Sequence, residues 1–78
     1  MKSCCTLDML PAGNTARVIE IKTCDIVARL NEMGVLLGEE VEILHRAPFG
    51  GPIALGIGNQ TLALRLDEAR LITVEVQF

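Results

Sequence analysis

The chain has 78 residues, a hydrophobic fraction of 50% and a formal net charge of −3. A chain of this length fills one compact core, so we expect residues 1–78 to form a single domain. Its seven basic residues are scattered, whereas a nucleic-acid backbone is held by clustered Lys and Arg. Because Phe49 and Phe78 are the only aromatic residues, the core is expected to be aliphatic. The chain also offers few aromatic side chains on which the bases of a single-stranded nucleic acid could stack. Nucleic acid is therefore not an expected partner.

The chain also lacks the usual features of membrane and secreted proteins. No apolar run approaches the roughly 20 residues that a transmembrane helix needs, so we expect no direct membrane insertion. Asp8 and Pro11 interrupt the segment where a secretory signal would be apolar. Cys4, Cys5 and Cys24 are odd in number and two are adjacent, which does not suit a disulfide framework. Free thiols in the reducing cytoplasm are expected.

The first part of the chain predicts a short helical turn followed by a strand. Residues 6–10 contain Leu7, Met9 and Leu10 and then meet a Pro-Ala-Gly breaker, which predicts a single helical turn. Residues 16–22 are rich in β-branched side chains and predict a half-buried strand. The alternation fails at Val18 and Ile19, where we expect a β-bulge.

One segment has the period of an α-helix. Apolar residues at positions 26, 27, 30 and 33 fall on one helical stripe, so the sequence predicts a helix over about 25–33. Gly34 follows, where a helix commonly ends in a left-handed residue. A short apolar loop, residues 35–38, then leads toward the next strand.

The rest of the chain alternates between apolar and polar residues with a period of two. This pattern predicts strands over 40–46, 53–57, 61–66 and 72–77, with a tight reversal at 58–60 and a helical turn near 67–71. Together with residues 16–22 the count is five strands. Five short strands with one apolar face each bury those faces by curling into a small barrel. We therefore expect a mainly β fold, a partly open five-stranded barrel with one helix.

No set of residues in the sequence suits catalysis. His45 is the only histidine, and on its strand it shares the parity of Val41 and Ile43, so a partly buried or strand-end position is expected. A metal site would have to draw on Cys4, Cys5, Cys24 and His45, which show no C-x-x-C or H-x-x-x-H spacing. These four residues are weak metal candidates at most. Gly56 and Gly58 lead into a strand instead of a helix, which does not suit a nucleotide-binding loop. We expect no enzyme activity and no resident cofactor.

The remaining candidates lie on surface loops and would bind a protein partner. Phe49 stands between Pro48 and two glycines on a loop that is expected to protrude. Val35, Leu36 and Leu37 form an apolar loop that we expect a barrel of this size to leave partly exposed. The alternative is that Leu36 and Leu37 fold back to cap an open end of the barrel. An exposed strand edge or this loop could also pair two copies of the chain, so a homo-oligomer stays open.

Three stretches of the sequence resemble the FeoA family. They are Leu-Pro-Ala-Gly at 10–13, Arg-Leu-Asn-Glu-Met-Gly-Val at 29–35 with Gly38 beyond it, and Leu-Ala-Leu-Arg at 62–65 followed by Glu68 and Ala69. The similarity extends from Leu7 to Val76. One departure is Leu37, because family members usually carry proline before the glycine that matches Gly38. The three cysteines match no motif of the family.

The resemblance implies an SH3-like barrel and a role in bacterial ferrous iron uptake. FeoA-like proteins are small cytosolic accessories of the transporter FeoB and are thought to bind its cytosolic, GTP-hydrolysing part, so they act through protein contact. Two alternatives remain: a regulatory barrel acting with a metal-dependent repressor of the DtxR type, and a metal chaperone that uses the thiols. The matched charges Arg29 and Arg65 could pair with Glu32 or Glu68 at short range.

Overall fold

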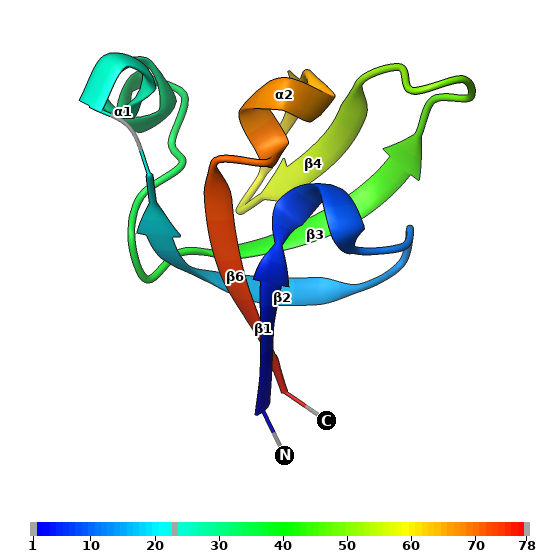
Figure 1. Ribbon diagram of the computed structural model, residues 1–78, viewed down its shortest axis with the longest axis horizontal. Coiled ribbons are helices and arrows are strands. Elements are labelled where there is room, and N and C mark those ends of the chain that lie inside the picture. The colour runs from blue at the N-terminus through cyan, green and yellow to red at the C-terminus, as the bar shows by residue number, and fades with distance from the viewer. Residues whose placement is uncertain (1, 23, 78) are drawn as a thin grey trace.

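The computed structural model describes residues 2–22 and 24–77, which form one six-stranded antiparallel sheet with three short helical segments (Figure 1). The elements in chain order are β1 (Lys2–Thr6), the 3-10 turn η1 (Leu7–Met9), β2 (Thr15–Ile21), α1 (Cys24–Glu32), β3 (Glu40–Arg46), β4 (Ile53–Ile57), β5 (Gln60–Leu64), α2 (Leu66–Ala69) and β6 (Ile72–Gln77). The strands are ordered β1-β6-β2-β3-β4-β5 across the sheet. The mainly β, SH3-like architecture expected from the sequence is confirmed.

The curved sheet encloses an aliphatic core. Alternate residues of the strands point inward, so that β3 buries Val41 and Ile43 while Glu40 and Glu42 face solvent. The core is completed from outside the sheet by Leu7 and Leu10 near η1, by Leu30 and Val35 around α1 and by Ala69 of α2 (the other buried apolar residues are Ala16, Val18, Ile53, Leu55, Ile57, Leu64, Ile72, Val74 and Val76). The helical segments therefore act as lids on an incompletely closed barrel.

Two bulges and one tight turn give the sheet its curvature. The register of β2 on β6 shifts between Val18 and Glu20, which confirms the bulge expected at Val18 and Ile19. A second shift lies between Ile43 and His45 of β3. Because of this shift, His45 does not point inward with Val41 and Ile43, as its parity in the sequence suggested. The imidazole is exposed at the end of the strand. Ile57 pairs with Gln60, which leaves a two-residue turn whose first residue, Gly58, has a φ of 57°.

The sequence-based strand count of five is wrong, because β1 was not predicted. Lys2–Thr6 is exposed over three residues and half-buried over two, so it lacks the apolar alternation by which a strand is recognised. It forms because β6 offers a free edge: Lys2 pairs with Gln77 and Thr6 with Thr73. Two element boundaries also differ, since β5 ends at Leu64 and Leu66 is the first residue of α2.

An ion pair ties α1 to α2. The Arg29 guanidinium pairs with the Glu68 carboxylate, and Glu68 is only 9% exposed. Glu68 Oε1 also accepts a hydrogen bond from the backbone N–H of Arg65 at 3.1 Å, which caps the first turn of α2. Of the two pairings open at the sequence level, Arg29 therefore uses Glu68. On the other side of α2, Arg70 Nε lies 3.7 Å from Asp8 Oδ2 of η1.

Candidate protein-interaction surface

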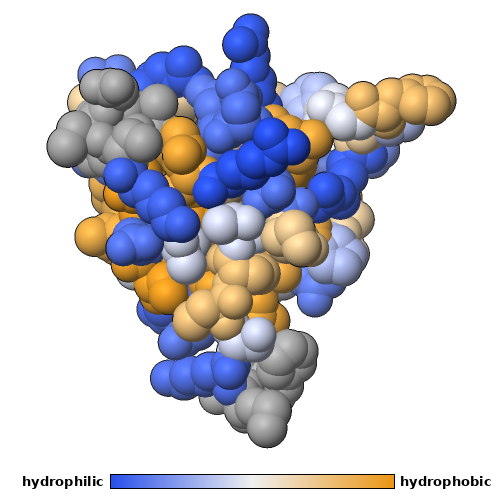
Figure 2. All heavy atoms as spheres, viewed as in Figure 1, coloured by the Kyte–Doolittle hydropathy of each residue, from blue (hydrophilic) through white to orange (hydrophobic). Residues whose placement is uncertain are grey.

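The β3–β4 loop carries the most exposed apolar side chain described in the structure. Phe49 has a relative exposure of 103%, so its ring contacts essentially nothing in its own chain. Its φ is 60°, a left-handed backbone conformation that is strained for a bulky residue. Figures 1 and 2 show this loop at the upper right, where an apolar projection stands out from the surface. The exposure expected for Phe49 is confirmed.

A groove of about 490 Å³ lies beside this loop and against α2. The loop contributes Gly50, Gly51 and Pro52, and the α2 region contributes a mixed set of side chains (Arg65, Leu66, Asp67 and Arg70). Leu66 is half-buried and lies under the loop, since a Cβ built on Gly50 would come within 3.7 Å of its Cδ1. The groove thus has an apolar floor and charged walls.

One stretch of the chain at this end of the barrel carries basic residues and no acidic ones. No Asp or Glu occurs between residues 43 and 66, while Arg46 and Arg65 do. Arg46 is half-buried and donates a hydrogen bond from Nη1 to the Leu10 carbonyl at 2.6 Å. Arg65 is exposed at the groove, where Asp67 is the nearest acidic neighbour along the chain. The groove therefore presents Arg65 and Arg70, with Asp67 beside them and Asp8 against Arg70.

The second predicted loop lies elsewhere. Leu36 and Leu37 precede β3 and Phe49 follows it, so the strand, about 20 Å long, separates the two loops (Figure 1). Leu36 is 42% and Leu37 66% exposed, so neither folds back fully as a cap. Val35 is 1% exposed and belongs to the core, which removes it from the exposed surface on which a partner could dock. Leu36 and Leu37 with Pro48 and Phe49 do not form one continuous surface.

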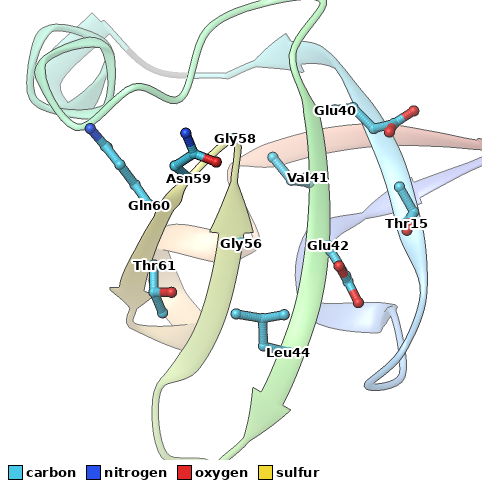
Figure 3. Close-up of a pocket in the computed structure, with 10 residues that line it drawn as sticks. All are labelled: Thr15, Glu40, Val41, Glu42, Leu44, Gly56, Gly58, Asn59, Gln60 and Thr61. Carbon is cyan, nitrogen blue, oxygen red and sulfur yellow. The ribbon is translucent and has the colours of Figure 1, made fainter.

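A further groove of about 430 Å³ runs over the outer face of β3, β4 and β5 (Figure 3). Leu44 lies across Gly56 on its floor, 3.3 Å from where a Cβ would stand. Figure 3 shows Glu40 and Glu42 on the side of the groove next to β2. There Arg17 is paired in register with Glu40 on one side and with Glu75 on the other, so opposite charges alternate across three strands. Arg17 therefore offsets part of the negative charge of the glutamates on this outer face, which resembles an ordinary solvated sheet surface.

The weak metal candidates are separated. Cys4 is exposed and Cys5 half-buried, because successive residues of a strand point to opposite faces. β6 and β2 lie between them and His45 in the sheet. The side chain of Cys24 lies outside the described part of the structure. Within residues 2–22 and 24–77, no group of three or more Cys, His, Asp or Glu side chains is placed to hold a metal ion.

The two thiols of β1 should differ in reactivity. Burial raises the pKa of the Cys5 thiol, and the charges of Asp8 and Cys4 raise this pKa further. Since the thiolate is the nucleophile, a raised pKa leaves less of it at neutral pH. The test compares two variants that both carry Cys24→Ser: one also carries Cys4→Ser and keeps Cys5, and the other also carries Cys5→Ser and keeps Cys4. We expect iodoacetamide at pH 7.5 to modify Cys5 in the first variant several-fold more slowly than Cys4 in the second. Mass spectrometry gives both rates, and the difference should disappear in urea. Equal rates in the folded proteins would contradict it.

The groove residues beside α2 were missed at the sequence level. Arg65, Leu66 and Arg70 are far from Phe49 along the chain and only the closed barrel brings them to its loop. The helical turn predicted over residues 6–10 is confirmed as η1, but the sequence did not indicate that Met9 in this turn is 68% exposed and adds an apolar side chain to the surface. The one available signal was the absence of acidic residues between 43 and 66.

Fold and surface together define a small SH3-like barrel with an aliphatic core, whose exposed apolar side chains include those of the loops at the two ends of β3. The FeoA domain family matches residues 5–76, nearly the whole chain. The chain therefore belongs to the FeoA family, whose members are small accessory domains of ferrous iron transport. The family assignment made from the sequence motifs is confirmed.

Solved structures agree with this assignment. An FeoA-like protein from Clostridium acetobutylicum is 32% identical, with a TM-score of 0.86 over 100% of this chain and 92% of that one. FeoA of Stenotrophomonas maltophilia, a prokaryotic SH3 domain protein complexed with zinc, is 33% identical, with a TM-score of 0.78 over 90% and 88% of the two chains. Among curated proteins, no significant match is found.

One fold relative comes from transcriptional control. A manganese-dependent transcriptional repressor has a TM-score of 0.87 at 23% identity over 99% of this chain. Only 44% of the repressor is covered, so the likeness concerns one domain of it and shows a shared fold alone.

In the described part of the present chain, no helix has the length and apolar character to cross a membrane.

Proposed function

We propose that this protein is a cytoplasmic accessory of bacterial ferrous iron uptake. It binds the cytosolic, GTP-hydrolysing part of the transporter FeoB and modulates its activity or its assembly. The observation that carries the proposal is the family match over residues 5–76. The exposed Phe49 supports the same conclusion, because an aromatic ring left fully in water is typical of a residue that is buried on binding.

The barrel itself favours a binding role. Its interior is filled by aliphatic side chains, and the grooves found among the described residues are open and lie on the surface. The exposed apolar residues of the loops at the two ends of β3 are therefore the features best suited to a partner.

The proposal is tested by co-elution of the purified protein with the FeoB cytosolic region on size exclusion. We expect a complex with the wild-type chain, and we expect at least one of the two substitutions Phe49→Ala and Leu37→Asp to weaken it while the circular dichroism spectrum stays unchanged. Both side chains are exposed, so neither substitution should unfold the barrel. If no complex forms with the wild-type chain, the proposed partner is wrong. If both variants bind normally, the partner docks elsewhere.

A further inference from the structure

We propose that the β3–β4 loop and the groove beside α2 together form the docking site, and that they bind an acidic protein segment that carries apolar side chains. Phe49 acts as the apolar anchor and Arg65, with Arg70, as the charged contact. This inference rests on the proposed function for the identity of the partner, but it makes separate claims about the surface and about the chemistry it recognises.

The first argument is that Phe49 is unfavourable in the isolated protein. A left-handed conformation costs a non-glycine residue about 1–2 kcal/mol, and the chain uses glycine at its other described positive-φ positions. Phe49 recovers nothing by packing, because its ring is fully exposed. A residue that is strained and makes no contacts weakens the fold, and strain of this kind is typical of functional sites. Burial of the ring on a partner would supply the missing compensation.

The second argument is that the loop holds the backbone at Phe49 in a fixed position. Ala47 N–H donates to the Pro52 carbonyl at 3.1 Å and Gly51 N–H to the Pro48 carbonyl at 3.2 Å, which closes the loop at its base. Gly51 lies so close to Ala47 that an added Cβ would stand 2.7 Å from the Ala47 Cβ. Two prolines restrict the backbone further. A backbone already held in place loses little conformational entropy on binding, so most of the ordering cost is confined to the Phe49 side chain.

The third argument concerns charge. The groove walls carry Arg65 and Arg70 against Asp67, and the segment from residue 43 to 66 contributes no carboxylate. Arg70 lies 3.7 Å from Asp8, with 64% of its side chain exposed, so it remains accessible to a second carboxylate. Together with the half-buried Leu66, these groups match a segment with both acidic and apolar side chains. A basic segment would meet the like charge of Arg65, for which no ion pair is found among the described residues.

The binding experiment measures Kd for the FeoB cytosolic region by isothermal titration calorimetry. We expect Phe49→Gly to raise Kd about thirtyfold, the size typical of an anchor residue. Arg65→Glu should raise it about tenfold, while Arg65→Lys should stay close to wild type. The matched control is Leu37→Asp, at the far end of β3, which should leave Kd within about threefold. A large effect of Leu37→Asp combined with a small effect of Phe49→Gly would overturn the assignment of the docking site.

The melting temperature provides a readout that a purely structural role would not give. Because glycine tolerates a positive φ and no contact of the ring is lost, Phe49→Gly should melt at or above the wild-type temperature. A lower melting temperature would show that the ring supports the fold and would overturn its role as a strained anchor.

A peptide experiment separates the inference from the identity of the partner. We expect a capped peptide of alternating Glu and Leu to shift the amide resonances of residues 48–52 and 65–70 in the ¹⁵N-labelled protein, and one of alternating Lys and Leu to shift them less. If the Glu peptide binds there while the FeoB region does not, the inference stands and the proposed partner fails. If the FeoB region binds but shifts only residues 36–40, the inference fails and the partner stands. If the loop resonances shift when the protein alone is made more concentrated, the surface binds a second copy of the chain and the proposed occupant is wrong. If the Lys peptide binds as well as the Glu peptide, the charge preference is refuted.

Discussion

Replacing Leu30 by alanine is expected to lower the free energy of unfolding by about 2–5 kcal/mol, the range found for large-to-small changes in a closed core. Leu30 lies on α1 and is 0% exposed, within the same cluster as the barrel residues. A domain of 78 residues has a total stability of about 4–12 kcal/mol, so the loss is a large share of it. Urea unfolding followed by circular dichroism measures the change.

The control for this prediction is Leu37→Ala. It removes the same side-chain atoms from a position that is 66% exposed, so the free energy of unfolding should change by less than about 0.5 kcal/mol. If the two variants have equal stability, α1 is not held to the barrel by Leu30. A detached α1 would leave the barrel folded, and the Leu30→Ala transition would then keep its midpoint and lose only helical signal.

The strands that alternate in sequence were the part of the fold open to prediction. In β3, β4 and β6 the inward side chains are all β-branched or leucine, and the period of two fixes both the element and its buried face. β1 was not predicted, because its Lys-Ser-Cys-Cys-Thr sequence has no alternating apolar residues that would indicate a buried face. Its pairing depends on the free edge of β6, which is a tertiary property.

The candidate site was predictable in part for a similar reason. Phe49 could be found because proline and glycine neighbours predict a protruding loop. The same local argument failed for Val35, since whether a loop residue faces inward depends on how the chain leaves α1. Here the Val35 N–H bonds to the Leu30 carbonyl at 2.8 Å, and the Val35 side chain lies in the core. The groove beside α2 combines residues from two distant segments, and no local pattern reveals such a site.

Strain and burial are distributed unevenly along the chain. All of the large side chains that are fully buried are aliphatic, and they lie in the strands or in and around the helical segments that cover the barrel. The described non-glycine residue with positive φ is instead found on a loop with no packing. This separation allows the loop to change without disturbing the core, which suits a surface that has to match a particular partner.

Replacing Glu68 by alanine is expected to lower the free energy of unfolding by about 1–3 kcal/mol, because two interactions are lost together. One is the hydrogen bond from the Arg65 N–H, which caps α2, and the other is the ion pair to Arg29 across to α1. Glu68 is 9% exposed, so water cannot take over the interactions that its carboxylate makes in the folded protein. The ion pair contributes less than a buried one, because 58% of the Arg29 side chain is in solvent, which screens the charge. Thermal unfolding at low salt measures the loss.

A double-mutant cycle identifies which acid Arg29 uses. We expect Arg29→Ala and Glu68→Ala to be coupled by about 0.5–1 kcal/mol, because the two side chains are in contact. Glu32, exposed on the same helix, was the other partner open to Arg29 at the sequence level, and Arg29→Ala with Glu32→Ala should combine additively. Coupling to Glu32 instead would mean that α1 satisfies its own charge and is free of α2, and the lid would then be held by apolar packing alone.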